Sequence, residues 1–91
     1  MNETVQRHLF VSGRVQGVFF RNFTQQTALE RDVTGWVRNL PDGRVEAVLE
    51  GTPSAVAAVE QALGEGPPQA RVGDVVGNTE SPAGHDGFRV R

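Results

Sequence analysis

Residues 33–50 read VTGWVRNLPDGRVEAVLE, and this stretch decides the fold. Asp42-Gly43 is a strong signal for a short β-hairpin, because glycine accepts the positive φ that such turns require. Before the turn, residues 33–39 predict a strand with small and branched residues on one face and Trp36 on the other. After it, hydrophobic residues alternate with polar ones over residues 45–50, which predicts a second strand with one face toward a core.

The flanking sequence completes a simple order of elements. Thr52 is a suitable N-cap, Pro53 suits the first position of a helix, and Gly64 is predicted to end it. The other predicted elements are a strand at 5–12, a helix from about 22 to 31, a strand from 71 to about 76 and a short strand at 88–90. We therefore expect one domain, residues 1–91, of α+β class: a ferredoxin-like βαββαβ two-layer sandwich in which an antiparallel sheet carries two helices on one face.

The amino-acid composition excludes several classes of catalytic and metal site. The 91 residues carry a formal net charge of −2 and no cysteine, which excludes a disulfide framework, a thiolate nucleophile and a cysteine metal site. All nine basic residues are arginine, so a Walker-type lysine and a Schiff-base lysine are excluded. The N-terminus lacks a secretory pattern, and the longest apolar run, residues 55–59, is too short to span a bilayer. We expect a cytoplasmic protein that does not contact membranes.

The stretch from Gly13 to Arg21, GRVQGVFFR, joins the first predicted strand to the first predicted helix. Such a junction directs consecutive backbone N–H groups toward one place, and the helix N-terminus adds partial positive charge. Gly13 and Gly17 permit the close backbone approach that a cradle for a tetrahedral dianion needs. Arg21 would add a permanently charged fork for phosphate oxygens. The alternative is a tight turn followed by a solvated arginine.

Asn39 ends the strand that precedes the predicted hairpin. Its amide has one acceptor and two donors, so it could accept a hydrogen bond from a water molecule while backbone groups hold it in place. A single asparagine before a turn is otherwise explained by turn chemistry.

Taken together, the two stretches closely resemble the two signatures of the acylphosphatase family. The first is VSGRVQGVFFR at 11–21; the second is GWVRN at 35–39, followed by DGRVEA at 42–47 and Glu50-Gly51. The resemblance covers nearly the whole chain and implies metal-free, cofactor-free hydrolysis of acylphosphates to carboxylate and phosphate. It implies that Arg21 binds phosphate and that Asn39 positions the attacking water. It also implies that the backbone of one loop forms the phosphate cradle. The residues of this loop are Val15, Gln16, Gly17, Val18, Phe19 and Phe20.

One position departs from the family pattern. The family usually has glycine at the end of the first helix, in a left-handed conformation, where this chain has Asp32. Aspartate tolerates that conformation better than most residues, at some energetic cost. We therefore expect Asp32 to be left-handed and to affect local stability rather than the site.

The remaining polar residues suggest no second chemistry. His8 and His85 have no histidine or cysteine partner at ligand spacing, so we expect surface or packing roles and no metal site. Glu46 and Glu50 are expected to be solvated on one face of a strand. Trp36 is expected to shield the open sheet face, or else to line the site mouth.

Three other functions compete with acylphosphate hydrolysis. A ferredoxin-like nucleic-acid module would need a basic surface and stacking aromatics, which this acidic chain lacks. A regulatory ligand-binding domain has no use for a residue that orients water. A carbamoyl-phosphate-cleaving domain of a larger maturation enzyme has similar motifs, but the chain length favours an independent enzyme. The expected partners are a small acylphosphate substrate and inorganic phosphate as product and inhibitor, with the protein a monomer.

Overall fold

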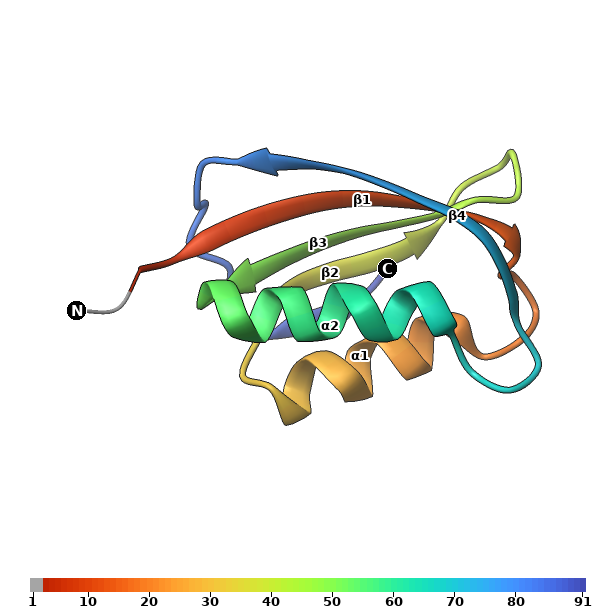
Figure 1. Cartoon of the computed structure of the whole chain (residues 1–91), viewed down its shortest axis with the longest axis horizontal. Coiled ribbons are helices and arrows are strands. Elements are labelled where there is room, and N and C mark those ends of the chain that lie inside the picture. Colours follow the sequence, from red (N-terminus) through yellow and green to blue (C-terminus); the bar gives the residue numbers. More distant parts are fainter. Residues whose placement is uncertain (1–2) are drawn as a thin grey trace.

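The computed structural model describes residues 3–91, which form a five-stranded sheet covered on one face by two helices (Figure 1). The elements follow the order β1 (Val5–Arg14), α1 (Phe20–Glu30), β2 (Thr34–Asn39), β3 (Val45–Gly51), α2 (Pro53–Glu65), β4 (Arg71–Glu80) and β5 (Phe88–Val90). The strand order across the sheet is β4-β1-β3-β2-β5. The predicted βαββαβ two-layer arrangement is therefore confirmed.

The sheet is mixed rather than wholly antiparallel, which corrects the prediction. β1 pairs antiparallel with β3 and β4, and β2 pairs antiparallel with β3, but β5 pairs parallel with β2. The reason lies in the direction of the strands. β4 runs antiparallel to β1, so it ends at the end of the sheet where β2 begins. The chain then crosses to the opposite edge and starts β5 from that same end.

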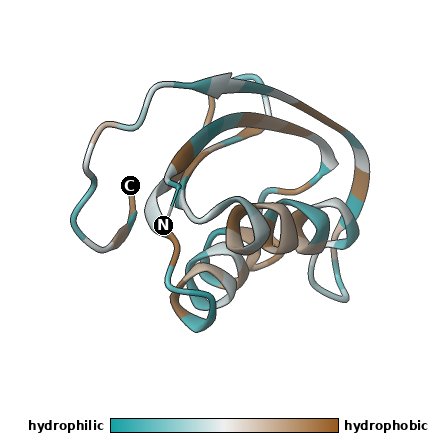
Figure 2. Ribbon diagram, turned by 60° about the vertical axis from the view of Figure 1, so that its left-hand side comes forward, coloured by the Kyte–Doolittle hydropathy of each residue, from teal (hydrophilic) through white to brown (hydrophobic). Residues whose placement is uncertain are grey.

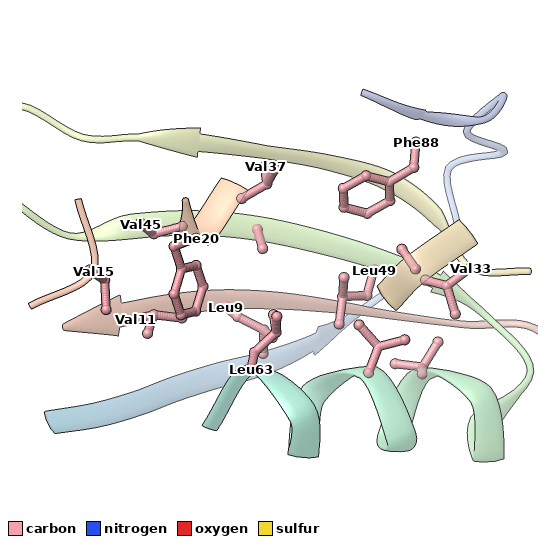
Figure 3. Close-up of a cluster of buried hydrophobic side chains, with 14 of the residues drawn as sticks. Leu9, Val11, Val15, Phe20, Val33, Val37, Val45, Leu49, Leu63 and Phe88 are labelled. Atoms are coloured by element: carbon pink, nitrogen blue, oxygen red, sulfur yellow. The ribbon is translucent and has the colours of Figure 1, made fainter. Parts of the chain in front are cut away.

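Hydrophobic side chains between the sheet and the helices form the core. Figure 3 shows Leu9 and Val11 of β1 and Leu49 of β3 lying near Leu63 of α2, with Phe20 of α1 beside them. Each of these five residues is at most 2% exposed. Figure 2 shows hydrophobic residues along the strands and both helices, whereas the connection that leads to the C-terminus is mainly hydrophilic. Burial of this apolar surface holds both helices against the sheet. It therefore also fixes the position of the start of α1.

Several element ends differ from the predictions. α1 begins at Phe20, because this side chain is buried in the core and draws the first turn against the sheet. α2 continues past the predicted stop at Gly64 and ends at Glu65, with Gly66 as its C-cap. β4 continues to Glu80 rather than ending near Val76, since residues 76–80 pair with residues 6–10 of β1. The length of a strand depends on its partner, which its own sequence does not reveal.

Three local predictions are confirmed. Thr52 caps α2, its hydroxyl accepting a hydrogen bond from the Ala55 N–H, and Pro53 is the first residue of that helix. The Asp42-Gly43 turn joins β2 to β3, and Gly43 has a φ of 97°. Asp32 follows α1 with a φ of 56°, in the left-handed region.

Candidate active site

A cleft of about 320 Å³ opens where the β1–α1 loop meets the ends of β2 and β5. It brings together Arg21 and Asn39, which lie in separate sequence motifs. The residues that line it are Val15, Gly17, Phe19, Phe20, Arg21, Asn22, Asn39 and Val90. Asn22 and Val90 were not predicted as site residues. Their positions at a helix start and in a terminal strand gave no signal, because both reach the cleft only through the tertiary fold.

Buried side chains within the loop and at the start of α1 anchor the loop before this helix. Val15, Val18 and Phe20 are at most 3% exposed, whereas Gly17 and Phe19 between them face solvent. Gly17 has a φ of 74°, and a Cβ there would touch nothing, so conformation rather than space requires glycine. The buried side chains thus fix the backbone of an otherwise exposed loop at the N-terminus of a helix, where an anion is favoured.

Gln16 fastens this loop to the β2–β3 turn. Its Nε2 donates to the main-chain oxygens of Leu40 (2.7 Å) and Arg44 (3.0 Å). Gln16 and Val18 do not line the cleft. The Gln16 amide links the loop to the hairpin by hydrogen bonds, and the Val18 side chain lies in the core. Two of the residues that the resemblance assigns to the cradle, Gln16 and Val18, are therefore not among the residues that line the cleft.

The Arg21 side chain is exposed in the first turn of α1. Its Nη1 donates to the main-chain oxygen of Arg91 at 3.3 Å. Within residues 3–91 no aspartate or glutamate side chain pairs with Arg21, although Arg7, Arg38 and Arg44 all have such partners. Because Arg21 also lines the cleft, its guanidinium can offer positive charge there to an anion.

Asn39 is the last residue of β2 and pairs with Val45 across the hairpin. Its side chain lines the cleft, and its Oδ1 atom is buried without a hydrogen-bond donor anywhere in residues 3–91. A buried acceptor without a donor lowers the stability of the fold, so such an atom is expected to accept a hydrogen bond from a water molecule or from a ligand. It is the one buried side-chain polar atom without a partner in the described part of the chain.

No titrating base lines the cleft. Its polar side chains are a guanidinium and two carboxamides, and no aspartate, glutamate or histidine is among the lining residues. No group of three or more His, Cys, Asp or Glu residues in the described range is placed to hold a metal ion. The arrangement can therefore bind an anion and hold a water molecule, but its side chains cannot take up a proton near neutral pH.

The ionisable networks around Glu46 and Glu50 lie outside the cleft, on the sheet face opposite the helices, and they overturn one prediction. Glu46 and Glu50 are each only 6% exposed, not solvated. Glu46 accepts from Arg38 Nε at 2.6 Å and contacts His8 Nε2 at 2.6 Å. Burial raises the pKa of Glu46, but the hydrogen bonds to His8 and Arg38 outweigh it and lower the pKa below its ordinary value.

Glu50 is held in a different way. Its carboxylate accepts hydrogen bonds from the main-chain N–H groups of Ala83, Gly84 and His85, at 2.6 to 3.2 Å. Burial opposes ionisation, but these donors lower the Glu50 pKa overall. The segment between β4 and β5 covers this carboxylate, and no pattern within β3 itself could have indicated that cover.

Trp36 lies on the same open sheet face and does not line the cleft. The guanidinium of Arg91 lies 4.5 Å from its ring centroid and that of Arg38 lies 5.4 Å away. The shielding role is thus the one that the structure favours over a place at the site mouth.

Together the fold and the cleft define a class: a small ferredoxin-like sandwich whose cleft is lined by Arg21, without an aspartate or glutamate partner in residues 3–91, and by Asn39, whose amide oxygen has no donor there. A protein-family model described as Acylphosphatase matches residues 7–90. The chain is 50% identical over 91 residues to an acylphosphatase of Natronomonas pharaonis, covering 100% of this chain and 99% of the relative. It is 54% identical over 92 residues to that of Haloquadratum walsbyi, again covering 100% and 99%.

A solved structure, an acylphosphatase from Coxiella burnetii, agrees with a TM-score of 0.94 at 42% identity, covering 99% of this chain and 94% of that one. The chain belongs to the acylphosphatase family.

Proposed function

We propose that this chain hydrolyses the mixed carboxylic–phosphoric anhydride bond of an acylphosphate. The observation that carries the proposal is the juxtaposition of two lining residues in one cleft: Arg21, which has no aspartate or glutamate partner in residues 3–91, and Asn39, whose buried Oδ1 has no donor there. One group supplies charge for a phosphoryl anion, and the other supplies an acceptor for water. A binding-only site would need the first and have no use for the second.

In this proposal the phosphoryl group sits on the loop of residues 15–20. The exposed backbone around Gly17 and Phe19 and the N-terminus of α1 favour negative charge there. Arg21 adds a planar, bidentate donor that remains charged at every physiological pH. Because these groups are held by buried neighbours, they need little rearrangement when charge develops during the reaction.

Asn39 orients the water. Its Oδ1 accepts one proton of the water molecule in a hydrogen bond, which leaves an oxygen lone pair free to approach phosphorus opposite the leaving group. The new P–O bond forms as the bond between phosphorus and the acyl oxygen breaks, and the carboxylate leaves with the electron pair. No phosphoenzyme forms, and the proton lost by the water passes to a phosphate oxygen or to solvent.

The chemistry explains why a base is unnecessary. A carboxylate is a stable leaving group that requires no protonation at neutral pH. Positioning and charge stabilisation can then supply most of the catalysis, as in other phosphoryl transfers. The cleft lining includes no carboxylate, imidazole or thiolate, the groups that usually hold a catalytic metal ion, so we propose a reaction that is independent of metal and cofactor.

The partners proposed are a small acylphosphate as substrate and inorganic phosphate as product and inhibitor. We also propose that the working unit is a monomer. In the described residues no helix is long and apolar enough to cross a membrane. A cytoplasmic location remains a prediction.

The test is phosphate release from benzoyl phosphate by the purified full chain in excess chelator, with Asn39→Ala beside it. Asn78→Ala is the matched control, because Asn78 is an exposed asparagine of β4 outside the cleft. We expect the wild type and the control to be active in chelator and Asn39→Ala to lose kcat by about a hundredfold or more, as when one preorganised group is deleted. Activity that requires an added divalent ion, or a folded Asn39→Ala with normal kcat, would overturn the mechanism.

A further inference from the structure

Phe19 occupies a position that folding alone does not explain. It precedes α1 as the N-cap, with φ 65° and ψ 24°, and it makes no side-chain capping bond. Its side chain is 71% exposed, more than any other large hydrophobic residue in the described part of the chain. The neighbouring Phe20, by contrast, is 2% exposed and fills the core.

Each of these features is locally unfavourable. A left-handed backbone is costly for a bulky residue and is usually left to glycine or asparagine. N-cap positions favour Ser, Thr, Asp, Asn or Gly, which satisfy the free N–H groups of the first turn. An exposed phenyl ring contributes no free energy of burial to the stability of the fold. An observed conformational outlier of this kind is a reason to look for a function.

The ring lies at the cleft. Phe19 lines it from the loop, and Val90 of β5, which is 38% exposed, lines it as well. The other exposed large hydrophobic residues, Leu29 and Val76, do not line this cleft. The lining of the cleft therefore combines two polar side chains, Arg21 and Asn39, with two exposed apolar side chains, Phe19 and Val90.

We propose that Phe19 and Val90 form an apolar subsite for the acyl group, so that the protein selects acylphosphates with an aromatic or other bulky apolar acyl group. This inference rests on the proposed function. An acylphosphate has an anionic end and an acyl end. With the phosphoryl group on the loop and Arg21, the acyl group lies in the rest of the same cleft, where Phe19 and Val90 offer exposed apolar surface.

The charge of the cleft narrows the substrate class further. Arg21 is the one cation among the lining residues, and the phosphoryl group uses it. An acyl group that carries its own carboxylate or second phosphate would find no additional positive partner there. An aromatic acyl group, in contrast, can pack against the Phe19 ring and remove apolar surface from water.

The test compares kcat/KM for benzoyl phosphate and acetyl phosphate and follows the ratio of the two. Phe19→Asn removes the ring while keeping a residue that tolerates the left-handed conformation and can cap α1. Phe19→Tyr retains the ring. Leu29→Asn is the control, because it removes a similarly exposed hydrophobic side chain of α1 outside the cleft.

We expect Phe19→Asn to lower the benzoyl-to-acetyl ratio about tenfold, mainly through KM for benzoyl phosphate. Phe19→Tyr and Leu29→Asn should leave the ratio within about twofold of the wild type. An equal loss on both substrates, or an unchanged ratio, would overturn the subsite while leaving acylphosphate hydrolysis intact.

A binding measurement separates this inference from the proposed function. On the wild-type chain, benzylphosphonate should bind about tenfold more tightly than methylphosphonate, and Phe19→Asn should abolish the difference. If neither acylphosphate is hydrolysed, the proposed function fails and the phosphonate affinities alone decide the subsite. Equal affinity of the two phosphonates for the wild type would overturn it.

Discussion

The Gln16 side chain donates from Nε2 to the main-chain oxygen of Leu40 at 2.7 Å. Leu40 directly follows Asn39, so a single hydrogen bond couples the loop proposed to bind phosphate to the residue proposed to orient water. A second bond from the same amide, to the Arg44 oxygen at 3.0 Å, holds both sides of the hairpin. The relative position of loop and hairpin thus depends on one half-buried carboxamide.

Gln16→Leu should therefore weaken activity without touching substrate directly. Loss of two hydrogen bonds, which leaves two main-chain oxygens without this donor, should cost about 1–3 kcal/mol of the free energy of unfolding. Misplacement of Asn39 relative to the loop should lower kcat more than it raises KM. Steady-state kinetics and urea unfolding curves check both effects. A variant that loses stability but keeps kcat would show that Gln16 supports the fold and not the site.

Arg21→Ala should separate anion binding from water positioning. Without the guanidinium the cleft has no cation, so both phosphate affinity and turnover should fall, the latter by about 3 kcal/mol of transition-state stabilisation. The measurements are the competitive inhibition constant of inorganic phosphate and the phosphate-induced rise in melting temperature. Arg31→Ala, which changes an exposed arginine outside the cleft, is the control.

Asn39→Ala should leave the phosphate inhibition constant within a few-fold of the wild type, since its proposed partner is water. If phosphate at tens of millimolar neither inhibits the wild type nor raises its melting temperature, the loop of residues 15–20 is not the anion site.

Asp32→Gly should stabilise the chain. Asp32 has a φ of 56° and is exposed, and its N–H donates to the Leu29 oxygen at 3.3 Å, a bond that glycine keeps. Relief of the left-handed strain, partly offset by the greater freedom of glycine when unfolded, should raise the free energy of unfolding by about 0.5–1 kcal/mol. Chemical denaturation measures this change, and kcat should not alter. A loss of stability would point to a contact of the Asp32 carboxylate in solution.

Stability should depend on pH through His8. Its Nε2 lies 2.6 Å from Glu46 and its Nδ1 3.0 Å from Glu80. Burial lowers the pKa of His8, but the hydrogen bonds to the two glutamates outweigh burial and raise it above 6.5. The charged histidine is favoured by folding, so its stabilisation is complete below the unfolded pKa of 6.5 and is lost as pH rises through the higher folded pKa.

The wild type should accordingly lose stability as the pH rises above about 6.5, and His8→Gln, which can still form hydrogen bonds but does not titrate there, should lose less. The measurement is the denaturant midpoint at each pH for both proteins. Equal slopes in the two proteins would show that His8 is not the titrating group.

Much of the architecture could be predicted because its signals are local. The Asp42-Gly43 turn, the Thr52 cap and the left-handed Asp32 each depend on one or two residues and their own backbone preferences. The two motifs likewise single out Arg21 and Asn39 as candidate site residues, and the fold then brings both side chains into one cleft.

What only the tertiary structure decided involves residues far apart in the chain. The length of β4 follows from its pairing with β1, and the parallel direction of β5 follows from the edge to which the chain returns. The burial of Glu50 depends on a segment more than thirty residues away, whose N–H groups reach its carboxylate. Phe19 and Val90 likewise meet at one cleft only in the folded chain. Sequence patterns report what a residue prefers beside its neighbours, whereas burial and cleft membership are set by which distant surfaces pack together.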